Sequence, residues 1–235
     1  MSKKIKKKVH IRILPVIICL LVLIIIFFIF SYLTKLPIKN IYISGNYYLT
    51  DQEIIELAKI DDYPSFIKTT SNQIKKNLKK SNLIDKINIT KKWWGIVQIN
   101  VKEYNILFRQ HDNDNKVVLE DKTIIDDEDY RYQVPKLLNY VPDNKYKSFI
   151  KGMNQITEDI KTQISEITYT PNEQDKDRFL LYMNDGNYVY LTLTKFKQIN
   201  YYEEVLKKLK DKKGILYLDS GNHFQIIEES NNTIS

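Results

Sequence analysis

The pattern of hydrophobic and polar positions divides the 235-residue chain into three segments. Residues 13–34 form an unbroken apolar run, which predicts one long helix. Residues 36–103 contain two stretches of helical spacing. On either side of them, apolar and polar residues alternate. In residues 105–227, several alternating stretches recur with two helical ones among them. The pattern predicts a membrane-length helix followed by a fold of the α+β class.

The apolar run is long enough to cross a bilayer. Its 22 uncharged residues would span about 33 Å as a helix, against a hydrocarbon core of about 30 Å. A cleaved signal peptide is the competing interpretation, but it requires a shorter apolar stretch and small residues at the cleavage site. Residues 27–32, Phe-Phe-Ile-Phe-Ser-Tyr, provide no such site. We therefore predict a retained transmembrane helix over residues 13–34, in contact with the lipid bilayer.

The basic charge of the chain lies almost wholly in its first twelve residues. They carry six of the net seven positive charges and no acid, which leaves +1 for the other residues. Because basic residues stay on the cytoplasmic side, they predict an N-terminus inside the cell and a C-terminus outside. This topology signal consists of Lys3, Lys4, Lys6, Lys7, Lys8 and Arg12. A nucleic-acid-binding protein would carry its basic excess on a folded face, so we predict no nucleic-acid partner.

Residues 36–103 predict strands and helices in the order β-α-α-β-β. A short strand ends at Gly45-Asn46, and capping boxes that begin at Thr50 and Thr70 each precede a helix. Two alternating strands then flank Trp93-Trp94-Gly95, as in a hairpin. Because adjacent strand positions face opposite sides, we expect one tryptophan to pack within the hairpin and the other to be exposed.

Residues 105–227 predict a strand-rich domain with flanking helices. Turn signals at Asp121-Lys122 and Asp185-Gly186 predict two hairpins, and the acidic run 126–129 predicts a solvated loop. The polar residues after Ile227 predict a flexible tail. The expected further elements are a helix over 145–164, a helix over 196–209 that stops before Gly214, and a final strand pair over 215–227.

Motifs for catalysis and metal binding are weak in this chain. Ser65-Phe66-Ile67-Lys68 and Ser148-Phe149-Ile150-Lys151 fit the S-x-x-K pattern of penicillin-binding proteins, but the K-T-G partner motif is absent from the sequence. A lysine-rich chain also produces such matches by chance. The three histidines are remote in sequence, and the only cysteine, Cys19, lies in the apolar run. We therefore predict no catalytic, cofactor-binding or metal-binding residues, no cofactor and no enzymatic activity.

Four elements in a fixed order carry a resemblance to a known family. The stretch 41–54 combines a strand, a Gly-Asn turn and a capped helix, and the hairpin 84–103 ends in Val-Lys-Glu. Val134-Pro135-Lys136-Leu137 and a helix-and-strand stretch over 202–224 follow. Together with the basic tail and the single anchor, this order resembles the FtsQ/DivIB family of bacterial cell-division proteins.

The resemblance implies a POTRA module (β-α-α-β-β) followed by a mixed β-domain with flanking helices, behind one transmembrane helix. The implied divisions of the chain are a basic cytoplasmic tail over 1–12, the transmembrane helix over 13–34, the POTRA domain over 36–104, the β-domain over 105–227 and a flexible tail over 228–235.

The resemblance also implies a function at the division septum of the cell membrane. The family's members are non-catalytic scaffolds that bind FtsL-type and FtsB/DivIC-type bitopic division proteins and help to regulate septal peptidoglycan synthesis. Two alternatives stay open. One is a POTRA-bearing transport or assembly factor, although these usually carry several such modules or precede a membrane barrel. The other is an anchored cell-wall enzyme.

The last strand of the chain is the predicted partner-binding site. A strand at the rim of a sheet presents unpaired backbone groups that accept a strand from another chain. We place this edge at Gly221–Ile227, supported from behind by Ile215–Asp219, and expect a proline at Gln225 to remove a ladder donor. The predicted partner-binding residues are Tyr217, Gly221, Asn222, His223, Phe224, Gln225, Ile226 and Ile227.

Overall fold

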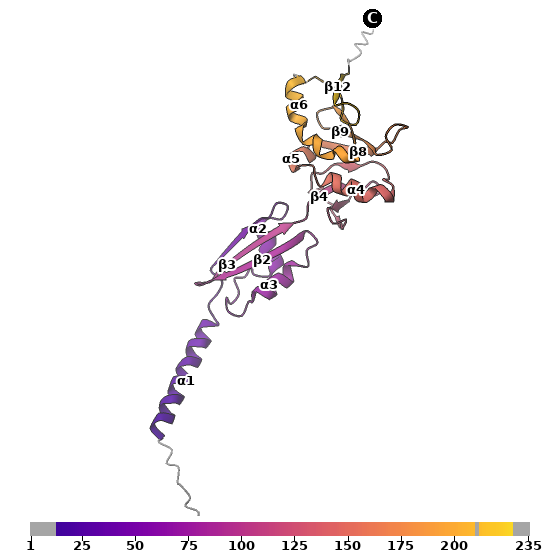
Figure 1. Cartoon of the computed structure of the whole chain (residues 1–235). Coiled ribbons are helices and arrows are strands. Elements are labelled where there is room, and N and C mark those ends of the chain that lie inside the picture. Colours follow the sequence, from indigo (N-terminus) through magenta and orange to yellow (C-terminus); the bar gives the residue numbers. More distant parts are fainter. Residues whose placement is uncertain (1–12, 210–211, 228–235) are drawn as a thin grey trace, which may run out of the picture. The chain divides into compact units, whose positions relative to one another are not determined.

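The computed structural model describes residues 13–209 and 212–227. The predicted basic tail over 1–12, with its topology signal, and the predicted flexible tail over 228–235 lie outside these described residues. The chain forms two compact units, which divide between Lys102 and Glu103 (Figure 1). Each unit has its own sheet and its own buried core.

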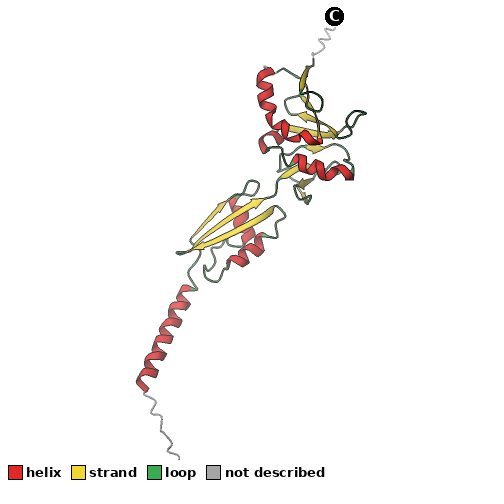
Figure 2. Ribbon diagram, in the orientation of Figure 1, coloured by secondary structure: helices red, strands yellow, loops and turns green. Residues whose placement is uncertain are grey.

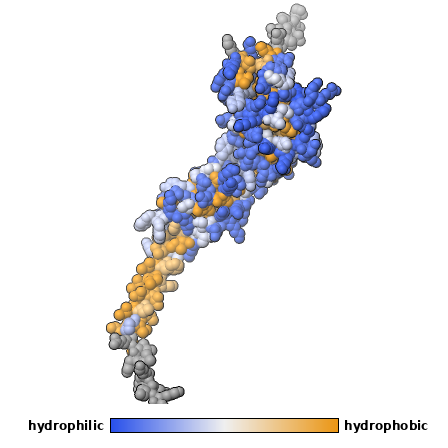
Figure 3. Space-filling view, viewed as in Figure 1, coloured by the Kyte–Doolittle hydropathy of each residue, from blue (hydrophilic) through white to orange (hydrophobic). Residues whose placement is uncertain are grey.

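The N-terminal helix α1 (Ile13–Leu33) is the apolar run predicted from the sequence. Its 21 residues are long and apolar enough to cross a membrane, and none of them is buried against the rest of the chain. In the space-filling view its surface is largely hydrophobic, whereas the surface of the rest of the described chain is mainly hydrophilic (Figure 3). This helix indicates a single-pass membrane protein.

The rest of the first unit is a three-stranded sheet in the order β1-β3-β2. β1 (Asn40–Ser44) pairs in parallel with β3 (Ile96–Glu103), and β2 (Ile84–Lys92) leads into β3 through a tight turn. α2 (Asp51–Ala58) and α3 (Ser71–Leu78) lie together on one face of the sheet (Figure 2). The predicted order β-α-α-β-β is confirmed.

Local capping explains why these two helices begin where they do. The Thr50 hydroxyl accepts the backbone N–H of Glu53, whose carboxylate accepts the Thr50 N–H at 2.7 Å, which completes the predicted capping box. At Thr70 the hydroxyl accepts the N–H of Gln73 at 3.2 Å, the forward half of the second box. The helices and the covered face of the sheet then share a buried core that includes Ile54, Ala58, Ile74, Leu78, Val97, Ile99 and Val101.

The second unit is built on a nine-stranded mixed sheet in the order β12-β11-β10-β9-β8-β7-β4-β5-β6. The strands are β4 (Ile106–Arg109), β5 (Lys116–Leu119), β6 (Ile124–Asp126), β7 (Lys136–Leu137), β8 (Ile164–Tyr169), β9 (Arg178–Met183), β10 (Tyr188–Thr192), β11 (Gly214–Tyr217) and β12 (His223–Ile226). The helices are α4 (Asp143–Met153), α5 (Glu158–Lys161), the 3-10 helix η1 (Leu193–Tyr201) and α6 (Tyr202–Leu209). This is the predicted α+β architecture, a mixed β-domain with flanking helices.

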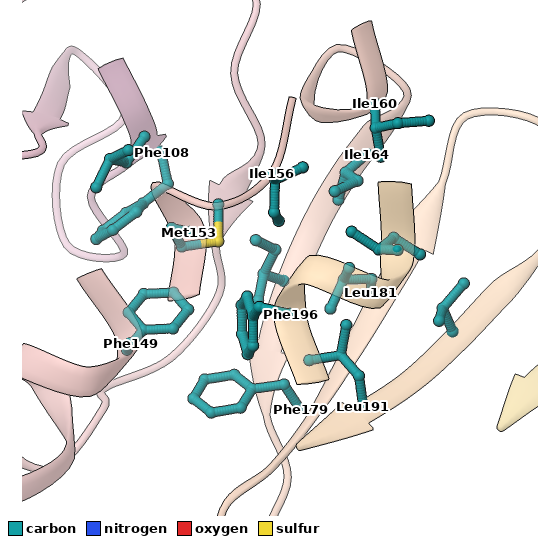
Figure 4. Packing of buried hydrophobic residues seen from close by; sticks show 14 of the residues in the cluster. Phe108, Phe149, Met153, Ile156, Ile160, Ile164, Phe179, Leu181, Leu191 and Phe196 are labelled. Atoms are coloured by element: carbon teal, nitrogen blue, oxygen red, sulfur yellow. The ribbon is translucent and has the colours of Figure 1, made fainter. Parts of the chain in front are cut away.

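Aromatic side chains hold the helices of the second unit against its sheet. Phe149 of α4 stacks on Phe179 of β9, with 4.9 Å between ring centroids, and Phe196 of η1 meets both rings edge-on (Figure 4). Gly152 makes the approach of η1 possible, because a Cβ there would lie 2.9 Å from the Phe196 ring. All three rings are completely buried, so α4 and η1 share one core.

The predicted single helix over 145–164 is wrong. α4 ends at Met153, α5 begins only at Glu158, and Ile164 already belongs to β8. The apolar positions that suggested one helix are nevertheless buried, because two short helices, the turn between them and a strand present them in order to the same core. Similarly, the stretch 196–209 is split between η1 and α6.

One residue of the acidic run 126–129, Asp127, is not solvated as the sequence predicts. Asp127 is only 5% exposed, and its carboxylate pairs with the buried guanidinium of Arg109 at 2.5 Å. The same carboxylate accepts the backbone N–H groups of Arg131 and Tyr132, at 2.8 and 3.3 Å. The other three acids of the run are exposed, so the prediction is wrong for Asp127 alone. A buried charge pair fastens this loop to β4.

Candidate partner-binding site

β12 is the outermost strand at one end of the nine-stranded sheet. It pairs antiparallel with β11, from Gly214 opposite Ile226 to Tyr217 opposite His223. In the turn between the two strands, Gly221 and Asn222 both have positive φ, 81° and 51°. Glycine and asparagine adopt this conformation at the lowest steric cost, so the turn sequence allows the chain to fold back along the sheet.

The pairing with β11 determines which backbone groups of β12 point outward. The N–H of Ile227 donates to the carbonyl of Lys213 at 3.1 Å. Because hydrogen-bonded pairs alternate in an antiparallel ladder, Gln225 also bonds to β11, whereas the N–H and C=O groups of Phe224 and Ile226 point away from it. A proline at Gln225 would therefore break the β11–β12 ladder. The correct position for testing the outer edge is Ile226.

A row of stacked side chains crosses one face of the sheet and ends on β12. Tyr190 stacks on Tyr217 with 5.4 Å between ring centroids, and Tyr217 stacks on His223 at 4.6 Å, with ring planes 9° apart. At the inner end, the Arg178 guanidinium lies 3.5 Å from the centroid of Tyr190, and its Nε donates to Asp219 at 2.7 Å. The exposed imidazole of His223 is the outermost member of this stacked row.

The other face of β11 and β12 borders an apolar groove of about 560 Å³. Side chains alternate between the two faces of a strand, so Leu216 and Phe224 lie opposite the stacked row. The groove runs between these strands and the helices η1 and α6, and Asn222 and His223 also line it. Its apolar walls are formed by Tyr201, Val205, Leu209, Leu216, Leu218 and Phe224.

A polar network joins the helical wall of the groove to its strands. The buried Tyr202, at the start of α6, donates its hydroxyl to Asp185 at 2.8 Å. Asn187 donates to the same carboxylate at 2.9 Å and accepts the backbone N–H of Gly214 at 2.7 Å. Burial, together with the bond to Asp185, raises the pKa of Tyr202. Burial alone would raise the pKa of Asp185, but the hydrogen bonds from Asn187 and Tyr202 lower it overall.

The structure places seven of the eight predicted partner-binding residues on β12 and its flanking positions, Gly221 to Ile227. Six of the seven are exposed, and Phe224 is half-buried beside the groove. Tyr217 lies on β11 instead. It reaches β12 by stacking on His223 and through its hydroxyl, which lies 3.2 Å from Oε1 of Gln225.

Sequence reasoning missed the groove and the inner part of the stacked row. Tyr201 and Val205 are four residues apart, a spacing that places them on one side of a helix, so their shared face was detectable. Arg178 and Tyr190 come together only through strand pairing. No pattern in the local sequence predicts that these two side chains are in contact.

The S-x-x-K matches have structural explanations. The Ser65 hydroxyl donates to the carbonyl of Thr34 at 2.6 Å and accepts the backbone N–H of Lys68 at 3.3 Å. Ser148 and Lys151 lie on the exposed side of α4. In the part of the chain that the structure describes, no three His, Cys, Asp or Glu side chains converge to hold a metal ion. The groups gathered at β12 are backbone, aromatic and apolar ones, which suit recognition of another chain.

The β-α-α-β-β module and the strand-rich domain define a POTRA-containing protein of the FtsQ type. Residues 36–104 match the family of POTRA domains of FtsQ type, and residues 107–220 match the C-terminal domain family of the cell division proteins FtsQ/DivIB. The chain belongs to the FtsQ/DivIB family and has a role in cell division. The predicted resemblance is confirmed.

Relatives from several bacteria align with this chain along most of their length. The cell division protein DivIB of Listeria monocytogenes is 27% identical over 235 residues, which cover 97% of this chain and 87% of that protein. DivIB of Bacillus subtilis is 28% identical over 193 residues, or 80% of this chain and 73% of that protein. A solved structure of the major extracytoplasmic domain of DivIB from Geobacillus stearothermophilus aligns with 46% of this chain and 96% of that chain, at 20% identity and a TM-score of 0.37.

Proposed function

We propose that this protein is a non-catalytic scaffold of the division complex that binds FtsL-type and FtsB/DivIC-type bitopic division proteins. In this proposal it helps to regulate septal peptidoglycan synthesis. Helix α1 crosses the cell membrane with the N-terminus in the cytoplasm, and a POTRA domain (36–104) and a β-domain (105–227) lie outside at the septum. One observation carries the proposal: an uncharged outer strand, β12, has outward backbone groups that border an apolar groove.

An extended segment of the partner would add to β12 as one more strand of the sheet. It would exchange hydrogen bonds with the outward backbone groups of Phe224 and Ile226. Its side chains would alternate between the two faces, so one set enters the groove beside Phe224 and the other meets the ring of His223. The backbone bonds supply affinity for any extended segment. The groove and the stacked row select apolar and planar side chains at alternate positions.

The test is substitution of Ile226 by proline in the full-length protein, with capture of the FtsL-type and FtsB/DivIC-type proteins of the same organism as the readout. Proline removes the outward N–H of Ile226, and the ladder bonds to β11 are made by its neighbours. The matched control Ile226→Ala shortens the side chain but keeps the N–H. We expect the proline variant to lose capture and the alanine variant to keep most of it. Capture at the wild-type level by a folded Ile226→Pro variant would contradict the proposal.

A further inference from the structure

The turn between β2 and β3 exposes both tryptophans of the chain. Trp93 is 88% exposed and Trp94 is 83% exposed, so the prediction that one of them packs within the hairpin is wrong. The reason is local: both residues lie in the turn itself, where Trp94 has a φ of 72° and Gly95 one of 79°. Removal of an indole ring from water stabilises a protein, and these two adjacent rings are left in water. An exposed apolar pair of this kind indicates a surface that contacts a partner.

Hydrogen bonds join two loops to the segment 34–39, which follows α1. One is the tryptophan turn, and the second loop is residues 63–67. The bonds are Ser65 Oγ to Thr34 O at 2.6 Å, Phe66 N to Leu36 O at 2.8 Å, Ile38 N to Pro64 O at 2.9 Å and Lys39 N to Gly95 O at 2.8 Å. The connection from helix to sheet is therefore bonded along its length.

The tryptophan turn lies close to the end of the membrane helix. A Cβ on Gly95 would stand 3.0 Å from the carbonyl oxygen of Pro37. Pro37 follows Leu33, the last residue of α1, by four positions, and four residues of fully extended chain reach at most about 14 Å. The distance between the turn and the helix end is therefore limited by a short, hydrogen-bonded connection.

The second loop adds further exposed apolar side chains at the same end of the POTRA domain. Tyr63 is 50% exposed and Ile67 is 41% exposed, on either side of Ser65, whose hydroxyl bonds to Thr34. Four exposed lysines surround the two loops and outnumber the two exposed acids, Asp61 and Asp62. These lysines are Lys35, Lys39, Lys68 and Lys92.

We propose that Trp93, Trp94, Tyr63 and Ile67 form a membrane-contacting collar that rests in the headgroup layer of the bilayer crossed by α1. This rests on the part of the proposed function in which α1 spans the membrane. Indole and phenol rings favour this layer, because their apolar bodies and polar N–H or O–H groups are both satisfied there. The surrounding lysines suit the phosphates of anionic lipids. The collar holds the POTRA domain in a fixed orientation on the membrane and presents the rest of its surface to partners.

The chain provides its own probe for this proposal, because Trp93 and Trp94 are its only tryptophans. We would reconstitute the full-length protein in liposomes of phosphatidylcholine and phosphatidylglycerol and record tryptophan fluorescence. We expect blue-shifted emission, protection from aqueous iodide, and strong quenching by lipids brominated near the headgroup end of the acyl chains. Lipids brominated near the bilayer centre should quench much less. The single-tryptophan variants Trp93→Phe and Trp94→Phe assign the effect to each ring.

A matched control places one exposed tryptophan at the other end of the same domain. Tyr47 is 67% exposed and follows β1 at the end away from Asn40, which pairs beside the tryptophan turn. In a Trp93→Phe, Trp94→Phe background, Tyr47→Trp should emit as in water and be quenched by iodide alone. Liposome flotation tests the anchor separately. Floating protein whose native tryptophans stay open to iodide and unquenched by bromolipid would overturn the collar and leave the anchor intact. Protein that fails to float would overturn both.

Discussion

The two outermost strands of the nine-stranded sheet, β6 and β12, occupy equivalent positions but are built differently. β6 has three residues, and by the same alternation its outward backbone groups belong to Ile124 and Asp126. A carboxylate therefore stands at that edge, and an acidic loop follows it. β12 has four residues without an acid or a lysine, and its outward groups belong to Phe224 and Ile226 beside a groove.

The difference indicates which edge is protected and which is available. Short strands, charged side chains and a covering loop are the means by which proteins keep sheet edges from pairing with other chains. β6 is short and carries an exposed aspartate, and the buried pair of Arg109 and Asp127 holds the loop that follows it. β12 is one residue longer, carries no acid or lysine, and adds a stacked row and an apolar groove. This contrast favours β12 over β6 as the strand that accepts a partner.

The largest effect is expected from Asp127→Ala, which removes the buried partner of Arg109 in the loop that follows β6. The substitution leaves the Arg109 guanidinium buried without its carboxylate, and loss of one partner of a buried pair costs about 3–5 kcal/mol. Urea unfolding of the protein measures this loss. The double variant Asp127→Leu, Arg109→Met should recover much of the stability, because no uncompensated charge remains. A loss below about 1 kcal/mol for Asp127→Ala would show that the pair does not hold the loop.

A smaller and pH-dependent effect is expected at the helical wall of the β12 groove. Tyr202→Phe removes the hydroxyl bonded to Asp185, which should lower the free energy of unfolding by about 2 kcal/mol at neutral pH. The raised pKa of Tyr202 means that this contribution is complete below pH 10 and declines as the pH rises above it. The lowered pKa of Asp185 means that its contribution is lost as the pH falls below 3.8.

Urea unfolding across the alkaline range checks this prediction. The stability difference between wild type and Tyr202→Phe should be constant near neutral pH and shrink above pH 10. A difference that is independent of pH throughout the alkaline range would argue against the hydrogen bond as its source.

A paired substitution compares the two edges directly. Phe224→Ala on β12 should weaken partner binding by about 1.5 kcal/mol, roughly tenfold in Kd, because it removes a wall of the groove. Ile124→Ala on β6 removes an apolar side chain that is more exposed than Phe224, at the other edge of the sheet, and should leave the Kd unchanged. Titration calorimetry with the purified partner segment measures both. Equal losses of partner affinity in the two variants would contradict the prediction that the partner binds at β12 and not at β6.

The smallest predicted effect concerns the end of the stacked row. His223→Ala removes the ring that a partner side chain would meet, at an expected loss of about 1 kcal/mol or a factor of about five in Kd. His223→Phe keeps a planar ring over Tyr217 and should restore most of the affinity. If the His223→Ala and His223→Phe variants bind the partner with equal Kd, stacking contributes nothing to recognition.

Much of this fold is predictable from sequence because its signals are local. The capping box at Thr50, the Gly45-Asn46 turn and the Asp185-Gly186 hairpin each fall within a few neighbouring residues, and the structure confirms all three. The order of strands is different. The two-residue strand β7 is inserted between β4 and β8, which are separated by more than 50 residues of chain, and short-range patterns carry no such information.

The candidate site was only partly predictable for the same reason. A terminal strand at a sheet rim follows from chain order, but the outward direction of Phe224 and Ile226 depends on the register with β11. A slip by one residue would reverse it, and the sequence alone does not exclude that slip. The burial of Asp127 is likewise decided by Arg109, 18 residues earlier, whereas the surrounding acids suggest only a solvated loop.

Backbone amide hydrogen exchange, resolved by residue, tests the central claim that β12 accepts a partner strand. The protein would be compared alone and bound to an FtsL-type or FtsB/DivIC-type partner. The account predicts that the outward amides of Phe224 and Ile226 become strongly protected on binding, while Gln225, already bonded to β11, changes less and Ile124 on β6 does not change. Unchanged exchange at Phe224 and Ile226 in the bound protein, or new protection at β6 instead, would contradict it.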